Sequence, residues 1–179
     1  MIDDIAMDIK TQKISASLGE DFLTWLWFKT EKDNGVFESP TNGVFTVVLG
    51  DKVVVMGGEG EFKESAMSSG KNSSFKEAKQ GLKVGKKVVL AKLIIEYNGE
   101  EWSFAIKSED FSFFSFKTPK VSKKINEDED PDGKFFEKLY LIEKGVELFD
   151  EIFKDFLKKR FDPIWEEEVE EMRKWLMTD

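Results

Sequence analysis

The residues best suited to chemistry in this sequence are carboxylates, but their spacing matches no complete catalytic or metal-binding pattern. The segment DEDPDG, residues 128–133, imitates the first half of an EF-hand calcium loop. Such a loop requires Glu at its twelfth position, where this chain has Leu139, and a helix is predicted to begin at Pro131. We interpret the segment as an acidic helix cap. The remaining carboxylates are typical of solvated helix surfaces, so a metal-dependent nuclease is the weakest functional hypothesis.

Other residue types narrow the chemistry further. The sequence contains no Cys and no His, which excludes disulfides, Cys/His zinc sites and mechanisms that need imidazole. The segment GLKVGKK is only distantly similar to a phosphate-binding loop, because three residues rather than four separate Gly81 from Gly85. Lys87 also stands where that loop requires Ser or Thr, and SSGKNSS lacks the leading Gly. We predict no catalytic residues, no metal ligands and no cofactor, and therefore a protein that is not an enzyme.

Lysines form the one pattern that favours a ligand. Residues 63–124 carry a net charge of +6, whereas residues 1–62 and 125–179 carry −6 and −9. One interpretation is a solvated surface whose lysines keep strand edges from pairing, which the residues alone favour. The other is sequence-independent binding of duplex DNA phosphates. The candidate DNA-binding residues adjoin predicted strands and are Lys83, Lys86, Lys87, Lys117, Lys120, Lys123 and Lys124.

Strand and turn patterns predict an antiparallel sheet of about five or six strands. Residues 43–58 read as two strands around a Gly50-Asp51 turn, and residues 59–67 add a third. Residues 86–106 read as a hairpin across Asn98-Gly99. In FSFFSF, residues 111–116, the alternation of faces breaks at the Phe-Phe step, so the strand either contains a bulge or is covered on both faces.

Helical patterns complete the prediction of an α+β fold. An N-terminal helix runs from Glu20 to Asn34-Gly35, and a short middle helix lies within residues 73–85. A long helix from Pro131 to about Arg160 and a second helix after Asp162-Pro163 predict an antiparallel C-terminal helical hairpin. The apolar seam of the long helix follows a heptad spacing through Phe135, Leu139, Ile142, Val146, Phe149, Phe153 and Phe156. We expect residues 1–126 to form the sheet domain and residues 127–179 the hairpin, packed as one unit.

The segment GEDFLTWLWFKTE, residues 19–31, carries large apolar side chains around the whole circumference of its helix. Such a helix must be buried or must meet a partner. We predict that Phe22, Trp25 and Leu26 are core residues, which leaves Trp27 and Phe28 for the helical hairpin or a second subunit. The predicted interface consists of aromatic residues from the first and C-terminal helices, namely Trp27, Phe28, Phe149, Phe153, Phe156 and Trp165.

Targeting signals are not apparent in the sequence. The start, MIDDIAMDIK, carries acids where a secretion signal has basic residues followed by an apolar run. No apolar stretch approaches the about 20 residues of a membrane-spanning helix. We therefore expect a soluble cytoplasmic protein with no membrane partner.

Several segments, taken in order, resemble the C-terminal half of RdgC-like, recombination-associated proteins of delta-type proteobacteria. They are GEDFLTWLWFKTE, GLKVGKKVVLAKL, EWSFAI, FSFKTPKV and DEDPDGKFFEKLYLIEKGVELFDEIFKDFL. The resemblance implies a DNA-clamp-like homodimer that binds duplex DNA with little sequence preference and acts with recombination proteins. It carries over no catalytic residue. Those relatives have a substantial region before TWLWF, so we expect a stand-alone remnant, a partner module or an excised domain.

Three hypotheses follow from the sequence. The first is a DNA-associated protein that modulates recombination and binds phosphates through its lysines. The second is a dimerisation or protein-interaction module without its own DNA affinity. The third is a metal-dependent nuclease, which would need a carboxylate cluster that binds Mg²⁺ or Mn²⁺.

Overall fold

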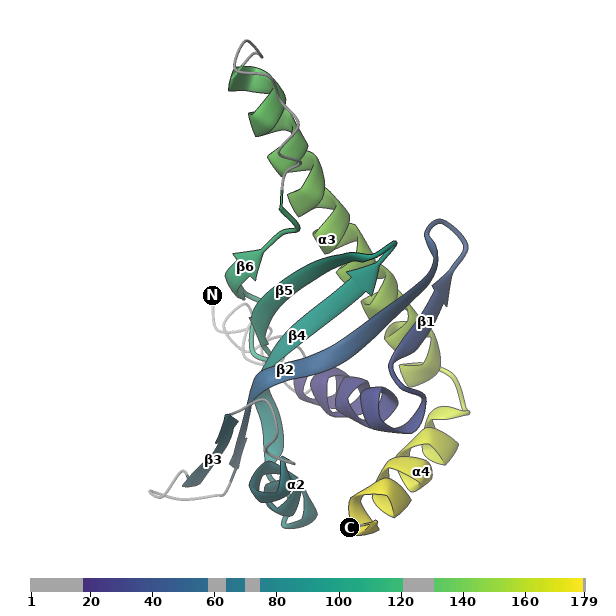
Figure 1. Cartoon of the computed structure of the whole chain (residues 1–179). Helices are drawn as coiled ribbons and strands as arrows, with labels where there is room; N and C mark the ends of the chain where they lie inside the picture. The colour runs from purple at the N-terminus through teal and green to yellow at the C-terminus, as the bar shows by residue number, and fades with distance from the viewer. Residues whose placement is uncertain (1–17, 58–63, 70–74, 121–130, 179) are drawn as a thin grey trace, which may run out of the picture.

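A computed structural model describes residues 18–57, 64–69, 75–120 and 131–178 (Figure 1). Five strands pair antiparallel in the order β1–β2–β4–β5–β6, and β3 pairs with the second half of β2. The strands are β1 Val36–Ser39, β2 Gly43–Gly57, β3 Glu64–Ser69, β4 Lys87–Tyr97, β5 Glu100–Lys107 and β6 Phe113–Lys117. The helices are an N-terminal helix over residues 18–32, α2 Lys76–Lys83, α3 Pro131–Arg160 and α4 Trp165–Met177. The predicted α+β fold is confirmed.

One predicted turn in the sheet is wrong. Residues on both sides of Gly50-Asp51 pair with the same strand, Leu49 with Leu93 and Val53 with Ala91, so β2 continues through this segment. The extra residues form a bulge opposite Lys92. A Cβ on Gly50 would lie 2.9 Å from Cγ of Lys92, so a larger residue there would displace the lysine side chain. The hairpin predicted across Asn98-Gly99 is confirmed by the pairing of β4 with β5.

The break in the alternation of β6 is a bulge. The register shifts between the Ser103–Lys117 and Ala105–Phe114 pairs, and Ser115 between them has a φ of 51°. Phe113 and Phe116 both turn toward Phe104 of β5, at ring-centroid distances of 4.9 and 5.2 Å. Phe114 lies on the opposite face and is 39% exposed. The sequence predicts either a bulge or a strand covered on both faces for this segment, and the structure has the bulge.

The N-terminal helix is covered on several sides at once. Phe22 packs edge-on against Phe149 and Phe153 of α3, with ring centroids 5.6 and 5.1 Å apart. Trp25 contacts Phe37 of β1 at 6.0 Å, and Trp27 contacts Trp175 of α4 at 5.5 Å. The predicted core residues Phe22, Trp25 and Leu26 are each 0% exposed, so that prediction is confirmed.

The predicted interface with a second subunit needs correction. Trp27, Phe28, Phe149 and Phe156 are buried within the chain. Phe153 and Trp165 are partly buried against the same core. Because α3, α4 and the N-terminal helix already cover one another at these rings, a second subunit cannot reach the four buried residues in the folded protein.

The two C-terminal helices do not form the predicted hairpin. Figure 1 shows α4 leaving α3 at a wide angle and passing beside the N-terminal helix toward α2. Trp175 near the end of α4 contacts Phe28, and the Lys79 ammonium of α2 lies 4.7 Å from the Trp175 ring centroid. The predicted division after residue 126 falls outside the described residues. The second half of α3 packs into the same core as the sheet.

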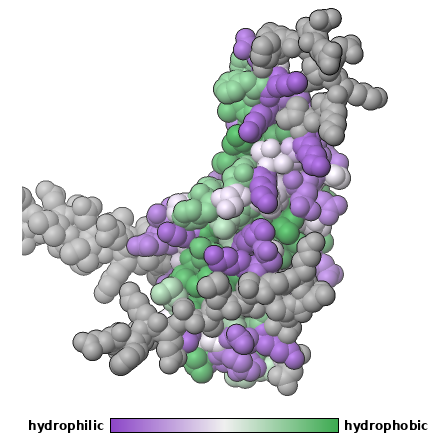
Figure 2. Space-filling model, turned by 60° about the vertical axis from the view of Figure 1, so that its left-hand side comes forward, coloured by the Kyte–Doolittle hydropathy of each residue, from purple (hydrophilic) through white to green (hydrophobic). Residues whose placement is uncertain are grey.

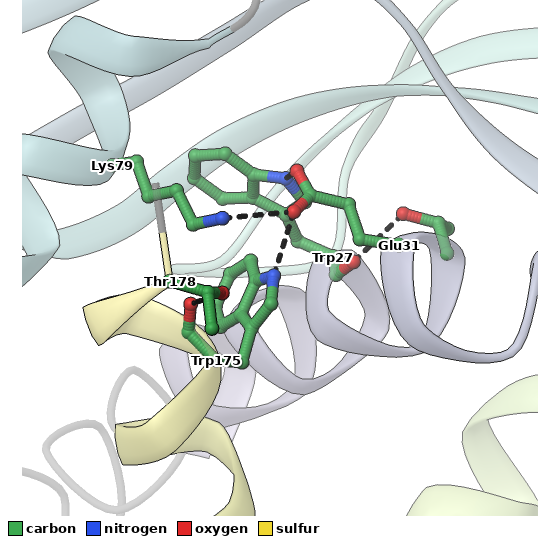
Figure 3. Close-up of polar contacts among 6 residues, drawn as sticks. Trp27, Glu31, Lys79, Trp175 and Thr178 are labelled. Atoms are coloured by element: carbon green, nitrogen blue, oxygen red, sulfur yellow. Dashed lines mark hydrogen bonds and ion pairs between the residues drawn. The ribbon is translucent and has the colours of Figure 1, made fainter.

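A carboxylate joins three of the helices (Figure 3). Glu31 of the N-terminal helix accepts hydrogen bonds from the indole N–H groups of Trp27, at 2.7 Å, and of Trp175, at 2.6 Å. The Lys79 ammonium of α2 lies 3.0 Å from the same carboxylate. Buried indole N–H groups need an acceptor, and Glu31 satisfies two of them where α4 meets the N-terminal helix.

A close contact fixes α3 against the sheet. The Trp102 indole of β5 donates a 2.7 Å hydrogen bond to the backbone carbonyl of Leu141. A Cβ on Gly145 would lie only 2.6 Å from Cδ1 of Trp102 and 2.9 Å from Cζ of Phe116. The glycine therefore lets a large ring lie directly against the helix. From this point toward its N-terminus α3 leaves the sheet and projects from the body (Figure 1).

We predict that Gly145→Ala destabilises the protein although Ala favours helix. The added methyl must displace Trp102, and overpacking of this kind costs about 1–3 kcal/mol of unfolding free energy. Urea denaturation followed by far-UV circular dichroism measures the change. Gly133→Ala in the same helix is the control, because no described residue has an atom within 4 Å of a Cβ there. Equal stability of the two variants would contradict the role of Gly145.

We predict that Glu31→Ala loosens α4 from the N-terminal helix. Two indole N–H groups lose their acceptor, at about 1–3 kcal/mol for each group that stays buried. Amide hydrogen exchange should accelerate in α4 while β4 and β5 keep their protection. Glu170→Ala is the control, since its ion pair with Arg173 lies on the exposed face of α4. Unchanged exchange in α4 would show that Glu31 does not hold that helix.

Candidate nucleic-acid interface

The two faces of the sheet differ in what covers them. The helices pack on one face, where Val47, Leu93 and Phe104 are 0% exposed (Figure 1). The opposite face, here called the outer face, has no described helix on it. Its residues alternate with the buried ones along each strand, as the period of a strand requires. Val48 on this face is 44% exposed.

A groove of about 520 Å³ lies on the outer face. Its charged residues come from four strands, Asp51 and Lys52 from β2, Lys92 from β4, Lys107 from β5 and Lys117 from β6. Leu90, Ala105, Phe114 and Ser115 supply the rest of its lining.

The register of the sheet brings these side chains together. Lys92 pairs with Ala105, and Ala105 pairs with Phe114, so the three stand in one row across β4, β5 and β6. Leu90 pairs with Lys107 in the next row on the same face. The bulge in β2 sets Asp51 and Lys52 beside Lys92. Both irregularities of the sheet therefore border the same groove.

The groove is positively charged. The Lys92 ammonium contacts the Asp51 carboxylate at 2.7 Å, and this hydrogen bond holds the pKa of Asp51 below its ordinary value. Four lysines and one aspartate leave a net charge of +3 among the lining residues. The Lys107 ammonium lies 4.8 Å from the Phe114 ring centroid, within range of a cation–π interaction.

These groups suit the binding of phosphate anions. Lysine supplies compact positive charge without the planar fork that reads a guanine edge, so it attracts phosphates whatever the sequence. The described residues contain no group of three or more acidic side chains that could hold a metal ion. Residues 128–130 of the acidic segment that imitates a calcium loop lie outside the described residues.

The predicted lysines do not all reach this groove. Lys117 lines it, whereas Lys83 ends α2 and Lys87 begins β4. Along β4, Lys87 lies three residues from Leu90, which lines the groove, or roughly 10 Å at 3.3 Å per residue. Lys86 directly precedes β4, and Lys120 is exposed beyond β6. Lys123 and Lys124 lie outside the described residues.

Three groove lysines were not predicted from the sequence. Lys92 interrupts the apolar run VVLAKLII, and its position between Ala91 and Leu93 sets it on the face opposite those two buried residues. That alternation was the available signal for Lys92. Lys52 was not predicted, because the turn expected at Gly50-Asp51 would separate this residue from β4. For Lys107 the sequence offered only its place at the end of a strand.

Comparison with known proteins identifies no relative. No protein-family model, no curated protein and no solved structure matches the chain. The resemblance to RdgC-like proteins therefore stays a prediction from the sequence. Within the described residues, no helix has the length and apolarity of a membrane span.

Proposed function

We propose that this protein binds DNA through the groove on the outer face of its sheet, without sequence preference. The observation that carries the proposal is the convergence of Lys52, Lys92, Lys107 and Lys117 from four strands, opposed by one aspartate. A concave array of one sign of charge raises the local concentration of an anionic ligand. Release of counterions from the bound phosphates then supplies most of the affinity.

The acidic character of the whole chain does not oppose this proposal. The net charge is −9, but interactions between exposed charges are largely screened beyond about 10 Å at 0.1 M salt. The acidic first turn of α4, Glu166, Glu167 and Glu168, belongs to a helix on the other side of the sheet (Figure 1). A phosphate in the groove would therefore respond mainly to the lysines around it.

The resemblance to RdgC-like proteins supports a role in DNA recombination for the proposed DNA binding. It favours duplex DNA as a ligand, modulation of recombination as the process and recombination proteins as partners. A protein with that role acts on DNA in the cytoplasm, which is the location predicted from the sequence.

We predict that labelled duplex DNA binds the protein with an affinity that falls steeply with salt. Lys107→Glu combined with Lys117→Glu should weaken binding at least tenfold, because the net charge of the groove changes from +3 to about −1. The slope of log affinity against log salt should shrink by about 2, since each lost phosphate contact removes about 0.9. Fluorescence anisotropy at several salt concentrations measures both quantities.

Two further variants serve as controls. Lys158→Glu combined with Lys174→Glu makes the same change in total charge at exposed residues of α3 and α4, on the covered side of the sheet, and should weaken binding much less. Asp51→Asn removes the one acid that lines the groove and should strengthen binding. Stronger loss from the distant pair than from the groove pair would refute the location of the site.

We propose, as a second function, that two copies of the chain associate through the projecting part of α3. Six large apolar residues there are between 37% and 64% exposed, namely Phe135, Phe136, Leu139, Tyr140, Ile142 and Val146. Figure 2 shows hydrophobic surface on the upper part of the molecule, where Figure 1 places the start of α3. An exposed apolar cluster of this kind is more often an interaction site than part of an ordinary surface.

The spacing of these residues favours a second helix as the partner. Phe135, Leu139, Ile142 and Val146 repeat at intervals of four, three and four, as in a coiled-coil seam. Lys138 and Glu143 flank that seam five residues apart, the separation at which opposite charges pair between two parallel helices. Each copy thus carries both the positive and the negative side chain of such a pair. This surface replaces the six aromatic residues first predicted for a homodimer.

We predict that Leu139→Glu combined with Ile142→Glu shifts the protein to the monomer. Two charges placed in the seam lose apolar contact and repel their equivalents in the other copy. Sedimentation velocity at increasing protein concentration measures the equilibrium, and circular dichroism checks that the variant is folded. Phe161→Glu combined with Ile164→Glu adds the same charge at exposed residues of the turn between α3 and α4. A wild-type monomer at every concentration would refute self-association.

A further inference from the structure

We infer that the groove receives an unpaired base on the ring of Phe114, so that its preferred ligand is single-stranded nucleic acid rather than a duplex. This inference rests on the proposed phosphate binding and names the class of nucleic acid that the same groove would take. The shared chemistry is an unpaired nucleotide, whether it comes from DNA or from RNA.

The first support is the way Phe114 comes to be exposed. Phe113 pairs with Ile106 on the core face and Phe114 with Ala105 on the outer face, so Phe114 faces outward by ordinary alternation, and the bulge that follows it turns Phe116 back into the core. Ser115 adopts a left-handed backbone conformation to allow this, with a φ of 51°. Non-glycine residues adopt that conformation at a cost, and such residues occur often at binding sites. Here the costly conformation lies directly after Phe114, in the lining of the basic groove.

The second support is the space beside that ring. Ala105 stands between Lys92 and Phe114 in the cross-strand row, and its small side chain leaves a gap between the two longer ones. Leu90 in the neighbouring row adds an apolar wall to the groove. The volume of about 520 Å³ lies within the range of small-ligand sites, which suits a nucleotide. Apolar and aromatic lining of this kind suits the face of a base.

The third support is the placement of positive charge. Lys107 lies 4.8 Å from the Phe114 ring centroid, and Lys117 lines the same groove from the strand that carries Phe114. A base stacked on the ring would thus have its own phosphates within the field of these lysines. Bases of an intact duplex are stacked on one another and present no face to Phe114, so only an unpaired strand gains this contact.

The groove offers little that could read one base in preference to another. Among the described residues its lining has no Arg, Asn or Gln, whose planar side chains bind base edges in a bidentate way. Stacking on an aromatic ring tolerates every base, because each has a π-face. We therefore expect binding of unpaired strands with little dependence on sequence.

The test compares labelled strands of about 12 nucleotides, within the range of known single-strand site sizes, by fluorescence anisotropy. Four ligands share one length: a DNA strand, an RNA strand, an abasic DNA strand and the DNA duplex. The full chain should bind the DNA strand about tenfold more tightly than the abasic strand, which is the size expected for one stacked base. Binding of the RNA strand shows whether the groove also accepts unpaired nucleotides that contain ribose.

Variants separate stacking from charge. Phe114→Ala should remove the difference between normal and abasic strands and leave abasic binding unchanged, whereas Phe114→Trp should retain the difference. Phe161→Ala, at a residue 75% exposed at the end of α3, is the matched aromatic control and should change nothing.

The outcomes also distinguish this inference from the proposed function. Equal binding of normal and abasic strands, both lost in the Lys107→Glu and Lys117→Glu variant, would overturn stacking and keep the phosphate site. A duplex that binds more tightly than the single strand would likewise overturn the inference. No binding of any of the four ligands at low salt would overturn both.

Discussion

The fold depends on one constraint, which is that the N-terminal helix carries large buried side chains around most of its circumference. A helix of this kind cannot rest on the surface of a sheet with one side in water. Phe22 requires the rings of α3, Trp25 requires β1, and Trp27 requires α4. The helices of the chain therefore gather around this one helix, on a single face of the sheet. Glu31 accepts hydrogen bonds from the indole N–H groups of Trp27 and Trp175, whereas the buried indole N–H of Trp25 has no acceptor among the described residues.

Covering one face of the sheet so completely leaves the other face to solvent. A strand alternates between the two faces, so each buried residue of β4 and β5 has a neighbour on the outer face. The lysines of the groove occupy such positions. The core and the proposed binding site are in this sense two sides of the same strands. A change of register by one residue would exchange them.

The irregularities of the sheet matter as much as its regular pairing. The bulge of β2 brings Asp51 and Lys52 beside Lys92, and the bulge of β6 follows Phe114 on the outer face and turns Phe116 into the core. Both features border one groove, which a sheet of regular strands would not contain in this form. On α3, Gly145 has a similar local effect, because it lets Trp102 approach the helix and so fixes where the helix leaves the sheet. Beyond that point Leu141 is still buried in the core, whereas Phe135, Phe136, Leu139, Tyr140 and Ile142 are exposed.

The sequence by itself determined the class and order of the elements, because helix periodicity, Asn-Gly turns and strand alternation are local properties. It placed Phe22, Trp25 and Leu26 in the core, located the long helix, and reduced the FSFFSF segment to two alternatives. Tertiary structure alone decided which lysines share a surface, since cross-strand register unites Lys52, Lys92, Lys107 and Lys117 from distant parts of the chain. It also decided that α4 packs on the N-terminal helix, because an apolar stripe predicts burial without naming its partner. The sequence did not show which half of the heptad seam on α3 is exposed and which is buried. The point where a helix leaves a sheet depends on tertiary contacts such as that of Gly145 with Trp102.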